Sequence, residues 1–275
     1  MIRTYYDEHV ENEWNRINGK FLEFETTYHF ITSTISKRSR ILDLGSGPGR
    51  YAFRLAQDGY AVHLADLSAN NIDFAKTYAD EHSIPILGAD VADATDLGLY
   101  KDNSFDVILC LGPFYHLETQ EDRNRCIREL YRVVKNGGYI FCAFIMNYAP
   151  VYDFLKRIPE SIADTEQTLL DWYTKGYMEH DKNTGTFYIS YFAEQEEIDT
   201  LFEASHFKKE YMFGCEGILN LRWDSLSAMD ESIKNKWLTL SYVFSKTAAG
   251  INSSEHVVYV GRKPYTEGEA HALTV

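Results

Sequence analysis

One ten-residue stretch, Ile41–Arg50, constrains the fold of this chain more than any other. It reads Ile-Leu-Asp-Leu-Gly-Ser-Gly-Pro-Gly-Arg, an apolar segment containing Asp43 that is followed by glycines at every second position. Glycine adopts backbone angles closed to other residues, and it has no Cβ atom to block a ligand lying against the main chain. Pro48 sits where a helix could begin, because its missing N–H would be unpaired there in any case. The stretch predicts a strand, a tight turn and a helix that together form a nucleotide-type cofactor site.

Acidic residues end the next two predicted strands. The strand Tyr60–Ala65 leads into Asp66, about 20 residues after the first glycine, where a carboxylate can accept hydrogen bonds from the hydroxyls of a ribose. A third strand around Pro85–Ala89 leads into Asp90, and a fourth covers Ser104–Gly112. Because the carboxyl ends of parallel strands meet at one edge of a sheet, we expect the four strand ends to converge on one crevice.

The order of the predicted elements indicates the fold class. Strands and helices alternate through the first half of the chain, which is typical of an α/β protein with a doubly wound, mostly parallel sheet. Seven strands are expected, the last three at Tyr139–Ile145, Phe207–Phe213 and Val257–Val260. We divide the chain into an N-terminal helical cap (1–37), a cofactor-binding core (38–146), an irregular, aromatic-rich lid insertion (147–192) and the C-terminal part of the core (193–275), with a helical insertion at about 218–250.

Several ordered segments make the chain resemble the class I S-adenosylmethionine-dependent methyltransferases. The segments are Asp43–Gly49, Asp66, Gly88–Val91, Phe105–Pro113 and Leu130–Tyr139, so the resemblance is strong over residues 38–146 and looser near the closing strands. It implies a Rossmann-like fold and S-adenosyl-L-methionine as the cofactor. It also implies contacts to the methionine part, the ribose, the adenine and the chain leading to sulfur, which we expect at Asp43, Gly45, Ser46, Gly47, Asp66, Leu67, Asp90, Val91 and Leu111.

An NAD-dependent dehydrogenase is the main competing interpretation, because that class also combines a glycine turn with an acid after the second strand. Two features of the turn disfavour it. Arg50 stands where the dinucleotide fingerprint has its third glycine, and Asp43 would place an anion near a pyrophosphate, which is unfavourable. A ligand with a sulfonium and an ammonium group, and no phosphate, fits the acid better.

The composition indicates which partners the chain binds and in which cellular compartment it is found. The net charge is −14, from 27 Lys and Arg against 41 Asp and Glu, which disfavours binding to nucleic acid. We expect neither a membrane span nor a secretory signal, and therefore a cytoplasmic location. The four cysteines show no metal-binding spacing, so we expect buried reduced thiols and no metal site. We also allow for a homodimer.

Methyl transfer to a hydroxyl or a protonated amine requires a general base. His116 is the candidate base and Tyr115 stands beside it, because both lie just beyond the fourth strand, where the resemblance places the methyl group. An unperturbed imidazole titrates near neutral pH, and a His that only orders its loop remains an alternative. The expected function is methyl transfer from S-adenosylmethionine to N or O of a small-molecule acceptor.

Two further interpretations remain open. The chain could methylate a protein or RNA, or it could bind S-adenosylmethionine without turnover. In the N-terminal segment, Tyr5 or Tyr6 could contact the methionine end of the cofactor, or the segment could bury its rings on the sheet. The expected lid offers aromatic faces that could bind an acceptor or pack into the core, at Trp172, Tyr173, Tyr177, Tyr188, Tyr191 and Trp223.

Overall fold

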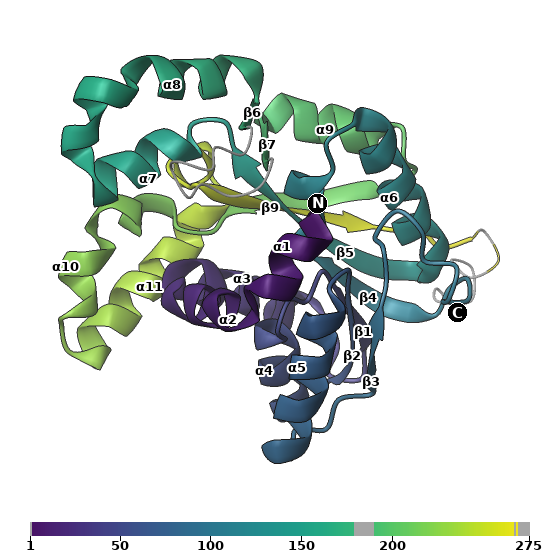
Figure 1. Cartoon of the computed structure of the whole chain (residues 1–275). Helices are drawn as coiled ribbons and strands as arrows, with labels where there is room; N and C mark the ends of the chain where they lie inside the picture. The colour runs from purple at the N-terminus through teal and green to yellow at the C-terminus, as the bar shows by residue number, and fades with distance from the viewer. Residues whose placement is uncertain (1, 179–189, 267, 269–275) are drawn as a thin grey trace.

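The computed structural model describes residues 2–178, 190–266 and 268, so Tyr188 and the rest of residues 179–189 lie outside the described part of the chain. Within that part, strands form one large sheet with helices packed on both of its faces (Figure 1). The strands are β1 (Arg40–Leu44), β2 (Ala61–Asp66), β3 (Gly88–Val91), β4 (Phe105–Cys110), β5 (Val134–Met146), β6 (Tyr177–Met178), β7 (Ser190–Ala193), β8 (Lys208–Gly214) and β9 (His256–Arg262).

The helices fall into an N-terminal group, a group that alternates with the strands, and two groups inserted after β5 and β8. They are α1 (Ile2–Glu8), α2 (Val10–Gly19), α3 (Phe21–Thr34), α4 (Arg50–Gln57), α5 (Ala69–Glu81), α6 (Gln120–Val133), α7 (Ala149–Arg157), α8 (Ile162–Lys175), α9 (Gln195–Glu203), α10 (Trp223–Ser227), α11 (Glu231–Ser245) and α12 (Ala248–Asn252), with short 3₁₀ turns η1 (Pro113–His116), η2 (Pro159–Ser161) and η3 (Gly217–Arg222).

The sheet has the expected doubly wound, mostly parallel order. Seven strands run β3-β2-β1-β4-β5-β9-β8, in which the pairings among β1 to β5 are parallel and β9 is antiparallel to both of its neighbours. The short strands β7 and β6 extend the sheet beyond the seven that the sequence predicted, because β7 pairs with the last residues of the long β5. The predicted fold class is confirmed, and the sheet is larger than expected.

Two separate cores explain why the central strands are apolar at almost every position. On β4, Val107 and Leu109 belong to the core that α3, α4 and α5 cover, whereas Ile108 and Cys110 face the core beneath α6 and α9. Alternate residues of β5 and β9 divide in the same way. A strand buried on both faces cannot alternate between apolar and polar residues, so a continuous apolar run is the signature of a parallel sheet covered on both sides.

The helices that follow β2 and β4 begin at side-chain caps that the sequence contains. The hydroxyl of Ser68 accepts a hydrogen bond from the backbone N–H of Asn71 at the start of α5, and Thr119 caps α6 through Asp122 in the same way. Both caps stand at the carboxyl edge of the sheet, so they fix the helix starts beside the crevice that the sequence predicted.

The segment after β5 contradicts its predicted irregular character. Residues 149–157 and 162–175 form the helices α7 and α8, and α8 ends at Gly176, which has a left-handed φ of 70°. Each of these helices buries a single described residue, Ala149 in α7 and Leu169 in α8. Most of their apolar side chains therefore stay on the surface, among them Val151, Leu155, Ile162 and Leu170.

The N-terminal helices lie against α4 and α5, near the carboxyl edge of the sheet (Figure 1). Asp7 on α1 accepts a hydrogen bond of 2.6 Å from the hydroxyl of Ser68, and Trp14 on α2 packs against the rings of Phe53 and Tyr78. These contacts hold α1 over the strand ends. None of the helices within the described ranges is both long and apolar enough to cross a bilayer.

Candidate functional site

A cavity of about 370 Å³ lies at the carboxyl ends of β1 to β4, beneath α1. Its walls are Gly45 and Gly47 after β1, Asp66 and Leu67 after β2, residues 92–95 after β3, and residues 112–113 and 115–117 after β4. Tyr6 and Glu13 close it from the N-terminal helices. The four strand ends that the sequence predicted to converge therefore line one cavity, whose size lies in the range of small-ligand sites.

The glycine turn forms the floor of this cavity. Gly45 and Gly47 have left-handed φ angles of 72° and 52°, and the N–H groups of Gly45 and Ser46 both donate to the carbonyl of Ala65. A Cβ atom on Gly45 would lie 2.6 Å from the side chain of Pro113, whereas a Cβ on Gly47 would meet nothing within 4 Å. Position 45 thus has to be glycine, because Pro113 packs against its backbone. At Gly47 the space above the backbone is open, which leaves room for a ligand.

Asp66 is held rigidly at the end of β2. One carboxylate oxygen accepts a hydrogen bond from the N–H of Gly47 at 2.7 Å, and the other accepts from the N–H of Ser68 and the amide of Asn71. Burial raises the pKa of Asp66, and these hydrogen bonds oppose that shift. The carboxylate therefore ties the glycine turn to β2 while it forms part of the cavity wall.

Asp43 lies buried behind the glycine turn, with a side chain that its surroundings do not satisfy. It is 2% exposed, and among the described residues its Oδ2 atom has no hydrogen-bond partner. Burial, and then the charge of Asp66, raise the pKa of Asp43 to about 7. A buried acceptor without a partner favours a cationic or hydrogen-bond-donating ligand nearby.

The structure places the two predicted contacts on β3, Asp90 and Val91, outside the cavity wall. Asp90 does not line the cavity, and its carboxylate instead lies 2.7 Å from Nε2 of His63 on β2 and accepts a hydrogen bond of 3.4 Å from the hydroxyl of Tyr100. Val91 is exposed and also lies outside the cavity wall. Ala92 and Asp93 line the cavity instead, and Asp93 accepts hydrogen bonds from the N–H and the hydroxyl of Thr95.

The loop after β4 carries the polar groups at the other end of the cavity. The hydroxyl of Tyr6, on α1, lies 2.7 Å from Nε2 of His116. Tyr115 also lines the cavity and donates to the carbonyl of Leu111 at 3.1 Å, while Phe114 is fully buried beneath them. Burial raises the pKa of Tyr6 well above its ordinary value, so Tyr6 remains a neutral phenol at neutral pH.

Acidic groups dominate the charge of the cavity. Glu13, Asp66, Asp93 and Asp122 line it, and among the described residues the one Lys or Arg in the wall is Arg125, which lies 3.6 Å from Asp122. Glu13 is itself paired with Arg16 on α2. This balance favours a ligand with positive charge and disfavours a pyrophosphate.

About half of the contacts predicted from the sequence lie in the cavity wall. Of the residues predicted as contacts, the wall contains Gly45, Gly47, Asp66, Leu67, Tyr115 and His116. The other five predicted contacts lie outside the cavity wall: Asp43, Ser46, Asp90, Val91 and Leu111. Glu13 and Asp93 were missed, and for Asp93 the available signal was its position three residues after Asp90, just past the end of β3.

The described aromatic residues of the expected lid do not reach the cavity. Tyr173 and Tyr177 are exposed, Trp223 stacks on Phe21 with ring centroids 5.0 Å apart, and Arg123 covers the ring of Tyr191. Among the described residues of 147–178 and 190–192, none lines the cavity. The described lid helices therefore pack beside the sheet edge, away from the glycine turn.

Comparisons with known proteins agree with the fold and the position of the cavity. Residues 42–142 match a family model described as a methyltransferase domain, a range that contains the glycine turn, Asp66 and the loop after β4. A structure of S-adenosylmethionine-dependent methyltransferases from Methanosarcina mazei is similar, with a TM-score of 0.60 and 21% identity over 86% of this chain and 98% of that chain.

Curated relatives share the same region of the chain. A glycine/sarcosine N-methyltransferase of Parasynechococcus marenigrum is 28% identical over 142 residues, which cover 50% of each chain. A ubiquinone biosynthesis O-methyltransferase of Rickettsia felis is 31% identical over 121 residues, which cover 40% of this chain and 48% of the relative. The matched segment thus spans about half the length of these curated relatives. Together with the order of the strands and the site at their carboxyl ends, these matches support the resemblance of the chain to the class I S-adenosylmethionine-dependent methyltransferases.

Proposed function

We propose that this chain transfers a methyl group from S-adenosylmethionine to N or O of a small-molecule acceptor, releasing S-adenosylhomocysteine. The observation that carries the proposal is the cavity itself, which joins the glycine turn and Asp66 at one end to the Tyr6–His116 pair at the other. The names of the two curated relatives include one N-methyltransferase and one O-methyltransferase, which supports the reaction type and leaves both acceptor atoms in the proposal.

The residues of the cavity suit the cofactor. Its size of about 370 Å³, the open space above Gly47 and the surplus of carboxylates fit a compact ligand that carries a sulfonium and an ammonium. We assign the ribose hydroxyls to Asp66 and the methionine part to Gly45, Gly47 and Glu13. We assign the adenine to Ala92 and Asp93, in place of Asp90 and Val91, because only the former pair lines the cavity.

When bound, S-adenosylmethionine supplies a methyl group activated by the adjacent positive sulfur, so the protein mainly has to align the acceptor and exclude water. Tyr6 and Tyr115 shape the end of the cavity, and α1 covers it. His116 takes up the proton of the acceptor hydroxyl or ammonium, which frees the lone pair that attacks the methyl group. Tyr6 holds the ring of His116 in position through the hydrogen bond to Nε2.

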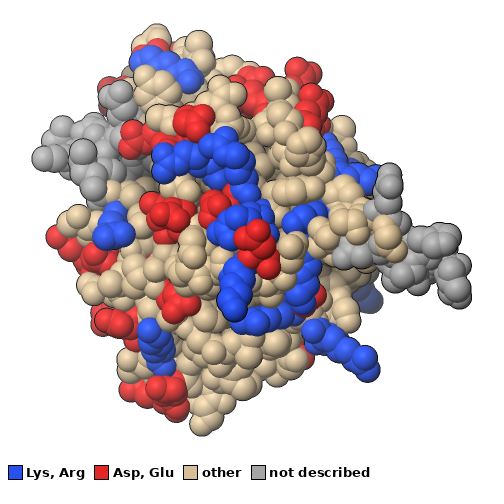
Figure 2. All heavy atoms as spheres, turned by 90° about the vertical axis from the view of Figure 1, so that its right-hand side faces the viewer, with Lys and Arg blue, Asp and Glu red and all other residues tan. Residues whose placement is uncertain are grey.

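A small acceptor is favoured by the enclosure of the site and by the distribution of charge. Lys and Arg side chains gather in a band on the face shown in Figure 2, yet acidic side chains lie among them. On α6, the arginines Arg125, Arg128 and Arg132 each lie within 3.6 Å of a carboxylate, at Asp122, Glu121 and Asp102 respectively. This compensation, with a net charge of −14, argues against a nucleic-acid acceptor.

The roles of the flanking segments belong to the same proposal. Residues 1–37 act as a cap over the cofactor. Residues 147–192 and the helices at 218–250, whose described residues lie outside the cavity wall, act as a lid on the acceptor side. The proposal also includes a homodimer and a cytoplasmic location. The four buried, free cysteines support the cytoplasmic location, because free thiols are typical of a reducing compartment.

Titration calorimetry with S-adenosylhomocysteine and, separately, with NADH tests the cofactor assignment without knowledge of the acceptor. We expect S-adenosylhomocysteine alone to bind, and Asp66→Ala to weaken that binding by about 1–3 kcal/mol because it leaves the ribose hydroxyls unpaired. A panel of amines, phenols and carboxylates with radiolabelled methyl donor then tests transfer. Binding of NADH, or of neither ligand by folded protein, would overturn the cofactor assignment, and binding without transfer to any acceptor class would favour a non-catalytic role.

A further inference from the structure

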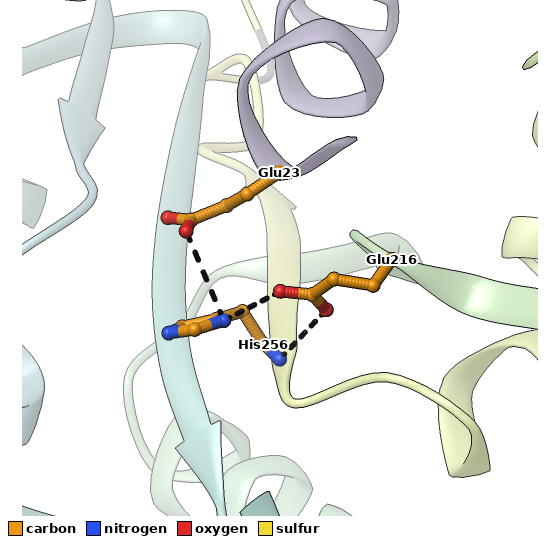
Figure 3. A group of neighbouring side chains, drawn as sticks. All are labelled: Glu23, Glu216 and His256. Atoms are coloured by element: carbon orange, nitrogen blue, oxygen red, sulfur yellow. Dashed lines mark hydrogen bonds and ion pairs between the residues drawn. The ribbon is translucent and has the colours of Figure 1, made fainter. Parts of the chain in front are cut away.

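Outside the cavity, three side chains from distant parts of the sequence converge at the carboxyl edge of the sheet. They are Glu23 on α3, Glu216 in the turn after β8 and His256 at the start of β9, and Figure 3 shows them pointing toward one another. Nδ1 of His256 lies 2.6 Å from Oε1 of Glu216 and 3.9 Å from Oε2 of Glu23. One nitrogen and two carboxylates thus face a common point, with their ligand atoms all within 4.8 Å of one another.

Backbone contacts fix the orientation of Glu216. Its Oε2 atom accepts hydrogen bonds of 3.1 Å from the N–H groups of both Glu255 and His256, which leaves Oε1 directed at the imidazole. Hydrogen bonds of this kind, which hold a ligating carboxylate through its other oxygen, are a regular feature of metal sites. The donor set is therefore oriented by the fold itself.

Glu23 is directed at the group without making a hydrogen bond within it. The distance of 3.9 Å from its Oε2 to Nδ1 of His256 is too long for a hydrogen bond. Two ligand atoms on opposite sides of a metal ion, each bound at about 2.1 Å, lie about 4 Å apart, which is close to this distance. The shorter distance between His256 and Glu216 would need to open by about 0.5 Å to admit an ion bound to both.

Charge and access agree with a cation at this point. Burial opposes a charged imidazole, yet Glu23 and Glu216 raise the pKa of His256 to about 9. A divalent ion would therefore bind in place of the imidazole proton, and it would then neutralise the two largely buried carboxylates. The side chains of Glu216 and His256 are 9% and 15% exposed, whereas that of Glu23 is 25% exposed and gives the site a path to solvent. Imidazole nitrogen with carboxylate oxygen is a donor set typical of Zn²⁺ and Mn²⁺.

We propose that Glu23, Glu216 and His256 bind one divalent transition-metal ion. The ion joins α3 to the ends of β8 and β9, three elements that the sequence separates by up to 233 positions (23 to 256). The site stands beside the cavity as well, because the charge of Glu23 acts on the hydroxyl of Tyr115. Its consequence is a fixed position for the N-terminal helices that cover the cavity.

The test uses the full chain, freed of metal by a chelator, and titration calorimetry with ZnCl₂ and with MnCl₂ at pH 8. We expect saturable one-to-one binding of at least one ion and a higher melting temperature when that ion is present. Glu23→Gln should weaken the binding more than about tenfold, because it removes a charged ligand. Glu25→Gln is the matched control, since it removes the same charge from the same helix outside the group and should leave the affinity unchanged.

A second measurement does not depend on any variant. In crystals of the wild-type chain soaked with Mn²⁺ or Zn²⁺, anomalous scattering should show a peak among the three side chains. Absence of such a peak, absence of saturable binding, or equal affinity of the Glu23→Gln and Glu25→Gln variants would each overturn the proposal and leave the group as an ion pair that anchors α3. The affinity for S-adenosylhomocysteine, measured in parallel, reports separately on the cofactor site.

Discussion

The hydroxyl of Tyr6 lies 2.7 Å from Nε2 of His116, although 110 residues separate the two in sequence. Tyr6 belongs to α1, which covers the cavity, and His116 belongs to the turn after β4, which forms its end. The contact therefore joins the N-terminal helix to the residue we propose as the base. It also implies that the position of α1 and the orientation of the imidazole are coupled.

Loss of this hydrogen bond should affect turnover more than cofactor binding. We expect Tyr6→Phe to lower kcat about tenfold through misorientation of His116, and His116→Ala to lower it by about 10² or more, the usual contribution of a general base. Both variants should bind S-adenosylhomocysteine with nearly unchanged affinity in calorimetry. Equal kcat in all three proteins would assign His116 a structural role only.

The two acids at the end of β3 should differ in their effect on the cofactor. Asp93→Ala should weaken S-adenosylhomocysteine binding by about 1 kcal/mol, the value of a typical hydrogen bond, because Asp93 lines the cavity. Asp90→Ala removes the partner of His63 and of the Tyr100 hydroxyl, outside the cavity, and should leave that affinity unchanged while it lowers the melting temperature. Calorimetry and thermal unfolding on both variants check this, and the reverse order of affinities would restore the assignment that the sequence suggested.

Gly47 and Gly59 form a matched pair for testing the glycine turn. Both have left-handed φ angles, 52° and 88°, and a Cβ atom would meet nothing within 4 Å at either position. Alanine at each should therefore cost a similar free energy of unfolding, about 1 kcal/mol from backbone strain. Gly47→Ala alone should weaken cofactor binding, because its methyl group would occupy the space where the ligand approaches the backbone. Equal cofactor affinity of the two variants would remove Gly47 from the site.

Asp43 should make the stability of the protein without ligand depend on pH. Its pKa is about 7 in the folded chain, against an ordinary value of 3.8 that it regains on unfolding. Between these values the folded state holds a proton that the unfolded state has lost, so the free energy of unfolding falls as pH rises from about 4 to about 7. Asp43→Asn has no titrating group at this position, so its free energy of unfolding should not fall in this way. In urea unfolding, its stability relative to the wild type should therefore increase between pH 5 and pH 8. A difference that is constant with pH would contradict the assigned pKa.

The sequence determined the core of the fold because strong local signals carry it. The run Ile41–Leu44 followed by glycines at 45, 47 and 49 can form only a buried strand and a left-handed turn, and Ser68 and Thr119 mark helix starts through their caps. The parallel sheet and the position of the site at the strand ends follow from this pattern. The helices α7 and α8 were missed because they pack outside the two cores to which the strands point, and each buries only one described residue.

Only the tertiary structure decided which side chains meet. In the sequence, Asp90 and Asp93 look alike, because both are acids near the end of a strand. In the structure, Asp90 lies against His63, whereas Asp93 lies on the cavity wall. The Tyr6–His116 contact and the group formed by Glu23, Glu216 and His256 likewise join elements that are far apart in sequence. Local propensity fixes strands, turns and caps, whereas the direction of a side chain across the packed layers depends on register and helix docking, which no local stretch encodes.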